Sequence, residues 1–291
     1  MYGKKILQKW RLVLTTLGIV SVNILPVSAN SKIVENAELS PNNNSSIVAL
    51  DFLDAIGGAI QFIQVSNISD EQEIAIGKRT NEQILNEYQL YNNDQVQDYV
   101  SNLGQELVNN SDSRDIPFNF QVVVSDQVNA FAVPGGYIYI TTGLLKTADN
   151  RAQLASVMAH EIAHINKRHS IEALKQAVVA RGIASTVGVE TNTLAQVAYQ
   201  LAVDLPQSRS FEYEADTGGL DILQQAGYPA EAFANFLAKL ESSGGTPEFL
   251  RTHPTSDNRI EAISQKTSAE KATTNKGQDK AAYRNNVLAL M

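Results

Sequence analysis

Two histidines and a glutamate stand together in the segment His160-Glu161-Ile162-Ala163-His164. On a helix, residues four apart lie on one face about a turn from each other, so both imidazoles can reach the same ion. This spacing is the HExxH pattern, in which the two histidines bind zinc and the glutamate acts as a general base. The chain has four histidines in all, so a chance occurrence of the pattern is on the order of a few in a thousand.

A third metal ligand must come from elsewhere, because a catalytic zinc ion takes three protein ligands and leaves a position open for water. The chain has no cysteine, so this ligand must be a histidine or a carboxylate. Glu212 and Asp216 are four residues apart, which lets Glu212 bind the metal while Asp216 accepts a hydrogen bond from a ligand imidazole. The same spacing from Glu214 leads to Gly218, which has no side chain, so we prefer Glu212. The remaining candidates are His169 and His253.

The chemistry that this set of residues predicts is hydrolysis of a peptide bond with one zinc ion as cofactor. Glu161 is predicted to take a proton from the attacking water and later to give it to the leaving amine. The negative charge that develops on the substrate oxygen needs a nearby donor. Tyr213, His253 or Arg259 could supply it, and the sequence does not choose among the three. A supporting or structural role is predicted for His169, which follows the expected end of the motif helix.

The elements that must position these residues are predicted to be mainly helices. Asp149 or Asn150 is expected to cap the motif helix, which continues to about Arg168. Ser69 opens a capping box and a helix to about Tyr91, and Asp94 opens another that ends near position 109. Further helices are predicted within 170–205, as a pair joined near position 191, and at 211–225 and 230–240.

A small sheet is predicted between the early helices and the motif helix. Alternating apolar residues indicate a strand at 118–126, and a second strand is predicted at 137–141. The segment 129–136 ends in Pro134-Gly135-Gly136 and is predicted to be the turn between them. The expected fold class is therefore α+β, a mainly helical metallopeptidase domain with a small β-sheet beside the motif helix.

The first residues have the pattern of an export signal, with four basic residues and no acid before an apolar run at 12–27. We predict a signal peptide at 1–29, a flexible linker at 30–46, a zinc metallopeptidase domain at 47–265 and a polar C-terminal tail at 266–291. The alternative is an uncleaved segment that anchors the chain. The predicted location is the periplasm, or otherwise another extracytoplasmic lumen.

The charge of the chain argues against nucleic acid as a partner. The net charge is −8, and the loss of four basic residues with the signal would make it −12. The apolar stretches at 47–65 and 177–203 are interrupted by charged or amide side chains, so no stable membrane span is expected after signal removal. The sequence does not indicate an oligomeric state.

The chain resembles the zinc metallopeptidases of the HtpX and CAAX prenyl protease family, in the soluble, secreted BepA/LoiP-like branch. The resemblance covers about 69–263 and depends on 129–136, the motif at 160–164 with Arg168-His169 after it, and the steps at 208–216 and 252–260. It implies a gluzincin-type fold with zinc on His160, His164 and Glu212, Glu161 as general base and Asp216 supporting a ligand. It also implies that the strand at 137–141 binds an extended substrate along the sheet edge. The substrate-binding residues expected from it are Gly136, Tyr137, Ile138, Tyr139 and Arg259.

Three functional hypotheses follow. The first is a zinc endopeptidase that cuts unfolded or misassembled envelope proteins, a form of protein quality control. The second is a chaperone-like peptide-binding protein whose zinc site is inhibited by His253, because the resemblance places this histidine near the metal as a catalytic donor or as a fourth ligand. The third is a structural metalloprotein with a closed four-ligand site.

Overall fold

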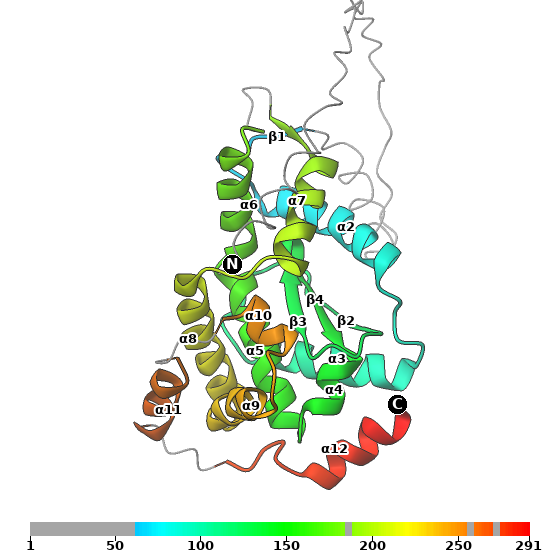
Figure 1. Cartoon of the computed structure of the whole chain (residues 1–291), viewed down its shortest axis with the longest axis vertical. Coiled ribbons are helices and arrows are strands. Elements are labelled where there is room, and N and C mark those ends of the chain that lie inside the picture. The colour runs from blue at the N-terminus through cyan, green and yellow to red at the C-terminus, as the bar shows by residue number, and fades with distance from the viewer. Residues whose placement is uncertain (1–61, 184–187, 255–258, 270–273) are drawn as a thin grey trace, which may run out of the picture. The chain divides into compact units, whose positions relative to one another are not determined.

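The HExxH segment lies on the helix α5 (Arg151–Asn166), which runs through the interior of the molecule (Figure 1). The computed structural model describes residues 62–183, 188–254, 259–269 and 274–291, all within one compact unit. The side chain of Asn150 accepts a hydrogen bond from the Gln153 amide and so caps α5, as the sequence predicts. Every residue from 152 to 165 is buried, which is typical of a helix surrounded by other elements.

A second helix, α8 (Arg209–Gln225), packs directly against α5 and carries Glu212 and Asp216. Two glycines permit this contact. A Cβ atom added to Gly219 would lie 3.0 Å from the backbone nitrogen of His160, and one added to Gly218 would lie 3.0 Å from the Ala163 Cβ. The absence of both side chains lets the backbone of α8 approach the face of α5 that carries the histidines.

Three strands form the sheet beside α5, in the order β2 (Asn119–Val123), β4 (Tyr137–Thr141), β3 (Ala130–Val133). The central strand β4 pairs parallel with β2 and antiparallel with β3. The α+β fold class and the two predicted strands are confirmed. The prediction that 129–136 is a turn is wrong for β3, since only η1 (Pro134–Gly136) turns the chain. Phe131 and Val133 are buried in β3, and Phe131 stacks on Tyr139 of β4 at 5.0 Å between ring centres.

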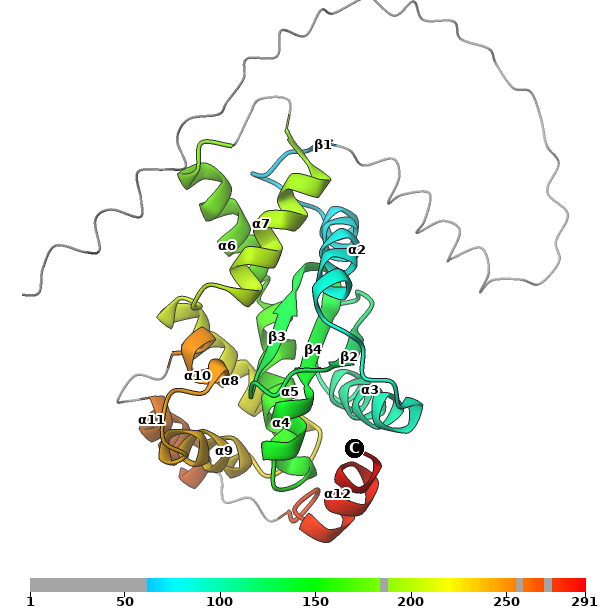
Figure 2. The same cartoon turned by 45° about the vertical axis from the view of Figure 1, so that its right-hand side comes forward.

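The helices before the sheet are α2 (Asp70–Glu87) and α3 (Asp94–Asn109). The predicted capping box is present at Ser69, which bonds with Gln72 in both directions, whereas the cap of α3 is Asn93 rather than Asp94. After α5, the chain forms α6 (His169–Ala180) and later α7 (Thr191–Val203), and these two helices stand side by side (Figures 1 and 2). The short strands β1 (Phe62–Ile63) and β5 (Val189–Glu190) pair antiparallel near their far ends.

One buried carboxylate ties three of these elements together. Glu73 of α2 accepts hydrogen bonds from the Gly135 amide, at 3.3 Å, and from Arg114, at 2.9 and 3.0 Å. It also lies 3.0 Å from the guanidinium of Arg168, a residue with positive φ between α5 and α6. The turn before β4 and the end of the motif helix are therefore held by the same side chain.

The remaining described elements are α9 (Glu231–Ser242), α10 (Glu248–Thr252), α11 (Arg259–Ala269), α12 (Lys280–Asn286) and η2 (Leu288–Leu290). The end of the chain differs from the polar tail predicted at 266–291. Tyr283 and Val287 are buried in the main core, and the Tyr283 hydroxyl donates to the Leu145 carbonyl at 2.9 Å. Leu288, Leu290 and Met291 pack against the same core, so the apolar end of the segment anchors the polar residues before it.

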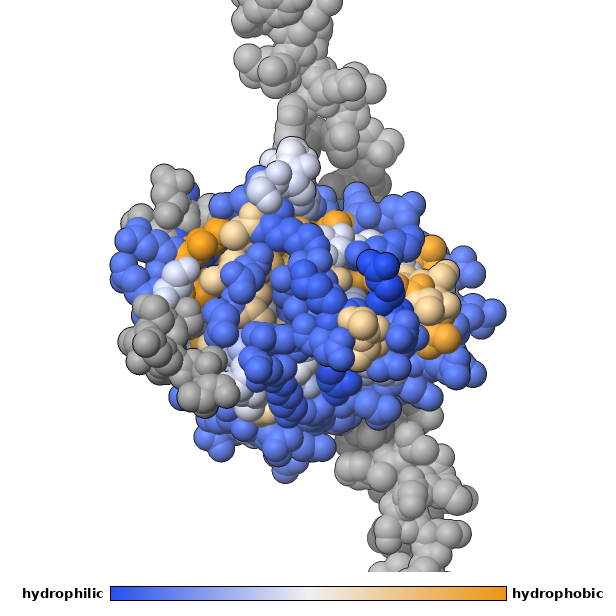
Figure 3. Space-filling model, turned by 90° about the horizontal axis from the view of Figure 1, so that it is seen from below, coloured by the Kyte–Doolittle hydropathy of each residue, from blue (hydrophilic) through white to orange (hydrophobic). Residues whose placement is uncertain are grey.

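The predicted signal peptide and linker, with residues 47–61 of the predicted domain, lie outside the described residues. Among the described helices, none combines the length and the apolar character that crossing a membrane requires. The face seen from below is mainly hydrophilic, with smaller hydrophobic areas between the polar side chains (Figure 3).

Candidate metal centre

Four buried side chains converge between α5, α8 and the end of α10. They are His160, His164, Glu212 and His253, and one ligand atom from each lies within 4.8 Å of all the others. The first three are the ligands expected from the sequence, and His253 joins them from the residue that follows α10. The structure thus brings together residues separated by up to 93 positions in the chain.

The separations between these atoms suit a single metal ion. The Nε2 atoms of His160 and His164 are 3.1 Å apart, and His253 Nδ1 lies 3.3 Å from His160 Nε2. Glu212 Oε1 lies 3.1 Å from His253 Nδ1 and 3.3 Å from His164 Nε2. A tetrahedral zinc ion with bonds near 2.0–2.1 Å places its ligand atoms about 3.3 Å apart. Imidazole and carboxylate donors are also those that zinc accepts in the absence of thiolates.

Each motif histidine is held by a second group on the ring nitrogen that faces away from the centre. His160 Nδ1 lies 3.1 Å from Asp216 Oδ1, one helical turn beyond Glu212. His164 Nδ1 lies 2.9 Å from His169 Nδ1, and His169 Nε2 lies 3.5 Å from Glu214. Such partners orient a ligand imidazole and select the tautomer that presents its free nitrogen to the metal.

A change at His169 tests whether this orientation matters. We expect the variant His169→Phe to bind zinc about 10- to 100-fold more weakly, because His164 loses the acceptor of its Nδ1 proton. Phenylalanine preserves the stacking on Phe211, whose ring centre is 4.4 Å from that of His169. Competition with a chelator of known affinity measures the effect. The variant His169→Gln retains an acceptor and is the matched comparison, and equal affinity in His169→Phe and wild type would contradict the prediction.

Arg259 does not occupy the place that a substrate-binding residue needs. Its side chain is only 1% exposed and donates to both oxygens of Asp216, at 2.6 and 2.7 Å. It also lies 2.7 Å from Glu212 Oε2 and donates to the His253 carbonyl at 3.1 Å. The predicted role in substrate binding is therefore corrected: Arg259 braces the metal-binding side chains from behind, since spacing in the sequence could not show which way it points.

The charges in this buried centre are closely balanced. Burial lowers the pKa of His160, but its hydrogen bonds to Asp216 and Glu212 outweigh burial and raise the pKa to about 9. Burial lowers the pKa of His164 to about 3, so this ring is neutral. Although burial opposes it, the nearby histidines hold the pKa of Glu212 well below its usual range. A metal cation among these donors would add positive charge beside the ionised Glu212 carboxylate, which Arg259 also approaches at 2.7 Å.

Glu161 stands beside the ligands on α5 and is also buried. Burial raises the pKa of its carboxyl group, while His253 and a hydrogen bond from the Ala132 amide act in the opposite direction. Its Oε1 lies 3.5 Å from His253 Nε2 and has no hydrogen-bond partner among the described residues. One carboxylate oxygen next to the centre is therefore free to accept a proton.

The predicted substrate-binding residues of the sheet lie in the wrong strand for edge binding. Gly136 precedes β4, and Tyr137, Ile138 and Tyr139 belong to it, yet β4 is paired on both sides. A central strand has no unpaired backbone groups, so a peptide cannot be added to it. The sequence pattern shows that β4 is a strand but not which strands flank it.

The edge strand next to the metal centre is β3. The Thr141 amide donates to the Asn129 carbonyl. The backbone amides and carbonyls of the odd-numbered residues of β3 are therefore hydrogen-bonded to β4, and those of the even-numbered residues point away from β4. On that outer side Ala132 donates its amide to Glu161, and its carbonyl lies 3.5 Å from the Ser170 hydroxyl. The short apolar run before Pro134 is the sequence signal that could have predicted this strand.

The segment that carries His253 was also missed by the sequence prediction. The five-residue helix α10 is hydrogen-bonded to the residue two positions before β3, since the Phe249 amide donates to the Val128 carbonyl at 2.9 Å. The Phe249 ring stacks on His253 with 4.6 Å between ring centres. A helix this short has too few residues to show a periodic pattern.

A buried helix with two histidines, facing a carboxylate on the neighbouring helix and a free glutamate beside them, defines the class of metalloendopeptidases. Comparison with known families agrees with this geometry. A sequence model of peptidase family M48 matches residues 94–267, more than half of the chain, and the chain therefore belongs to this family. Membership confirms the resemblance in the sequence and implies a metal cofactor.

The curated relatives include several proteases. A protein named beta-barrel assembly-enhancing protease from Yersinia pestis is 34% identical over 212 residues, which are 67% of this chain and 44% of the relative. Its namesake from Escherichia coli (strain K12) is 33% identical over the same shares. The mitochondrial metalloendopeptidase OMA1 of Schizosaccharomyces pombe is 29% identical over 174 residues, 57% of this chain and 52% of the relative. The chain thus spans less than half the length of the first two relatives.

Proposed function

We propose that this chain is a zinc-dependent endopeptidase that cuts unfolded or misassembled proteins of the cell envelope. The observation that carries the proposal is the convergence of His160, His164 and Glu212 beside a free Glu161 carboxylate oxygen. Two relatives named for enhancing β-barrel assembly support an envelope substrate. The spacing of the donors supports one zinc ion.

The residues divide the catalytic work as follows. His160, His164 and Glu212 would hold the ion, which when bound supplies positive charge to polarise the substrate carbonyl and the attacking water. Glu161 accepts the proton of that water through its free oxygen and returns it to the leaving amine. Asp216, with Arg259 behind it, keeps the His160 ring oriented while this happens.

The outer edge of β3 supports the choice of unfolded protein as substrate. Ala132 points both its amide and its carbonyl away from β4, toward Glu161 and Ser170. A peptide in extended conformation can replace these contacts and pair with β3 as an added strand. A folded protein has few free extended segments, so an edge of this kind selects chains that have lost or not yet gained their structure.

The proposed location is the periplasm, supported by the basic and apolar N-terminal pattern, with an anchored form or another extracytoplasmic lumen as alternatives. Proteins or peptides are the proposed partners. The test of the function is whether the zinc-loaded wild-type chain digests casein, an unfolded protein, while the variant Glu161→Gln does not.

A chaperone-like protein with its zinc site inhibited by His253 is the second candidate. The relatives are named as proteases, so the comparisons do not favour it. One observation supports its regulatory element: His253 Nδ1 lies within 3.3 Å of both His160 and Glu212, where a fourth ligand would stand. A ligand there would close the position that substrate and water need.

The variant His253→Ala separates an inhibitory role from a catalytic one by the sign of its effect. If His253 closes the site, we expect casein hydrolysis to rise about tenfold, which corresponds to about 1.4 kcal/mol of released inhibition. If His253 donates to the transition state, activity should fall about 10²- to 10³-fold. Rates at saturating zinc measure the change. The control is Arg251→Ala, on the same short helix, whose side chain is 47% exposed.

A further inference from the structure

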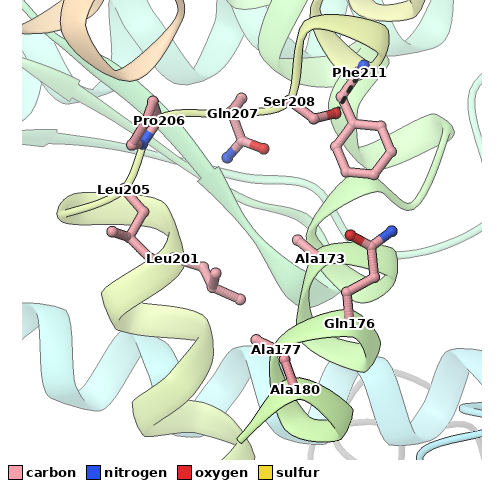
Figure 4. Close-up of a pocket in the computed structure, with 10 residues that line it drawn as sticks. All are labelled: Ala173, Gln176, Ala177, Ala180, Leu201, Leu205, Pro206, Gln207, Ser208 and Phe211. Carbon is pink, nitrogen blue, oxygen red and sulfur yellow. Dashed lines mark hydrogen bonds between the residues drawn. The ribbon is translucent and has the colours of Figure 1, made fainter.

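A cavity of about 320 Å³ opens between α6, α7 and the start of α8, and we name it the α6–α7 pocket (Figure 4). Ala173 and Ala177 line it from α6, and Leu201 lines it from α7, across the gap. The segment 205–208 crosses one end, and the Phe211 ring closes it on the side of α8. Its volume is at the lower end of the range for ligand pockets, about 300–1,000 Å³.

The lining of the pocket is mainly apolar and carries no charged side chain among the residues that form it. The apolar members are Ala173, Ala177, Ala180, Leu201, Leu205, Pro206 and Phe211. The polar members are Gln176, Gln207 and Ser208, and Ser208 is already used as the cap of α8. Such a lining favours an aliphatic or aromatic group and disfavours an ionised one.

The walls of the pocket are linked to the metal centre through two sets of contacts. Phe211 lines the pocket, directly precedes Glu212 and stacks on His169, which lies 2.9 Å from His164. On the other side, the Gln207 amide donates to the Thr252 carbonyl at 2.8 Å, next to His253. An occupant of the pocket would therefore touch Phe211, which is linked to the ligand His164 through a single intervening side chain, His169.

The walls of the pocket that α6 and α7 form lie toward the carboxyl end of β3, whereas Gln207 approaches α10 from the opposite end of the pocket. Ser170, three residues before Ala173 on α6, donates its hydroxyl to the Ala132 carbonyl at 3.5 Å, and Ala202 of α7 packs in one cluster with Val133. The amino end of β3, in contrast, is next to α10. A peptide that pairs antiparallel with β3 places its amino-terminal part beside the carboxyl end of the strand.

We propose that the α6–α7 pocket is a specificity pocket for an apolar side chain of the polypeptide substrate, on the amino-terminal side of the bond that is cut. The proposal rests on the proposed proteolytic function and names the substrate feature that the enzyme recognises. Exposed apolar side chains distinguish an unfolded chain from a folded one, so the pocket and the edge of β3 select for the same state of the substrate.

Filling the pocket should change specificity rather than abolish catalysis. Cleavage of a peptide library by the wild type first identifies the substrate position at which Leu or Phe is preferred. We expect Ala177→Leu to lower kcat/KM at least about tenfold for peptides with Leu or Phe there, and to leave peptides with Ala there nearly unchanged. The matched control is Val179→Phe, which adds bulk to α6 at a side chain that is 67% exposed.

A second variant tests the same proposal if Ala177→Leu fails to fold. Leu205 is 42% exposed, so Leu205→Ala should fold, widen the pocket and shift preference from Leu toward Phe. Wild-type cleavage without an apolar preference, or an unchanged profile in both variants, would overturn the pocket proposal.

Binding separates failure of the pocket from failure of the proposed function. The zinc-loaded variant Glu161→Gln should bind a fluorescent peptide with Leu at the preferred position more tightly than one with Asp, and Ala177→Leu in that background should remove the difference. If the wild type cleaves nothing, no preferred position is known, and the two peptides are then a casein fragment with Leu and the same fragment with Asp in its place. Tighter binding of the Leu peptide would then mean that the proteolytic function is wrong but the pocket still binds apolar side chains. Equal binding of both peptides would overturn the pocket itself.

Discussion

The variant Glu161→Gln is expected to lose peptide hydrolysis by about 10³-fold while it keeps its metal. Glutamine has nearly the same shape but cannot accept and return a proton, and general-base catalysis contributes about 10²- to 10⁴-fold. Glu161 lies outside the group of four converging ligand atoms, so the metal donors stay in place. The loss should therefore appear in the chemical step rather than in metal affinity.

Two measurements on the same preparations test this expectation. Zinc content by atomic absorption should be equal in variant and wild type, and casein digestion should differ by the stated factor. The control variant is Glu172→Gln on α6, where the same chemical change affects a carboxylate that is 51% exposed. A Glu161→Gln variant that still digests casein at the wild-type rate would rule out the assigned role of this residue.

The variant Arg259→Met is expected to lower the free energy of unfolding by about 3–5 kcal/mol, because it leaves two buried carboxylates without their guanidinium partner. Arg259 contacts both Asp216 and Glu212, as His160 also does, and it joins α11 to α8. Methionine can fill much of the volume but supplies no charge and no donor. Urea unfolding of the metal-free protein measures the change without a contribution from zinc binding.

Two further variants make the arginine experiment selective. Arg259→Lys preserves the charge but not the forked geometry, so an intermediate loss is expected. Arg79→Met removes an exposed ion pair with Glu82 and should cost less than about 1 kcal/mol. If Arg259→Met is no less stable than Arg79→Met, the buried network does not stabilise the fold.

Local spacing predicted the parts of the site that lie on one helix. His160 and His164 are four residues apart on α5, and Glu212 and Asp216 are four apart on α8, so their faces follow from helix geometry alone. The position of Arg259 does not follow in this way, because its partners are 43 and 47 residues distant. A long-range ion pair leaves no periodic trace in the sequence.

The sheet shows the same limit of local sequence patterns, which identify strands but not the order in which they pair. Alternation correctly identified β2, since burial of one face imposes a period of two, and β4 was identified by its apolar residues after the Pro134-Gly135-Gly136 turn. The order of the strands depends on which backbone groups pair, and backbone groups are the same for every residue. The edge was therefore assigned to Tyr137–Tyr139 when Ala132 of β3 occupies it.

The close contact of α8 with α5 at Gly218 and Gly219 has a thermodynamic consequence. Because the proposed ligands are divided between these two helices, the packing of the helices and the binding of the ion are linked equilibria. An ion present at a hundred times its dissociation constant would stabilise the packed state by about 2.7 kcal/mol. By reciprocity, the packing of the two helices strengthens binding of the ion by the same free energy by which the bound ion strengthens the packing. The two glycines, though they touch no ligand atom, thus set part of the metal affinity.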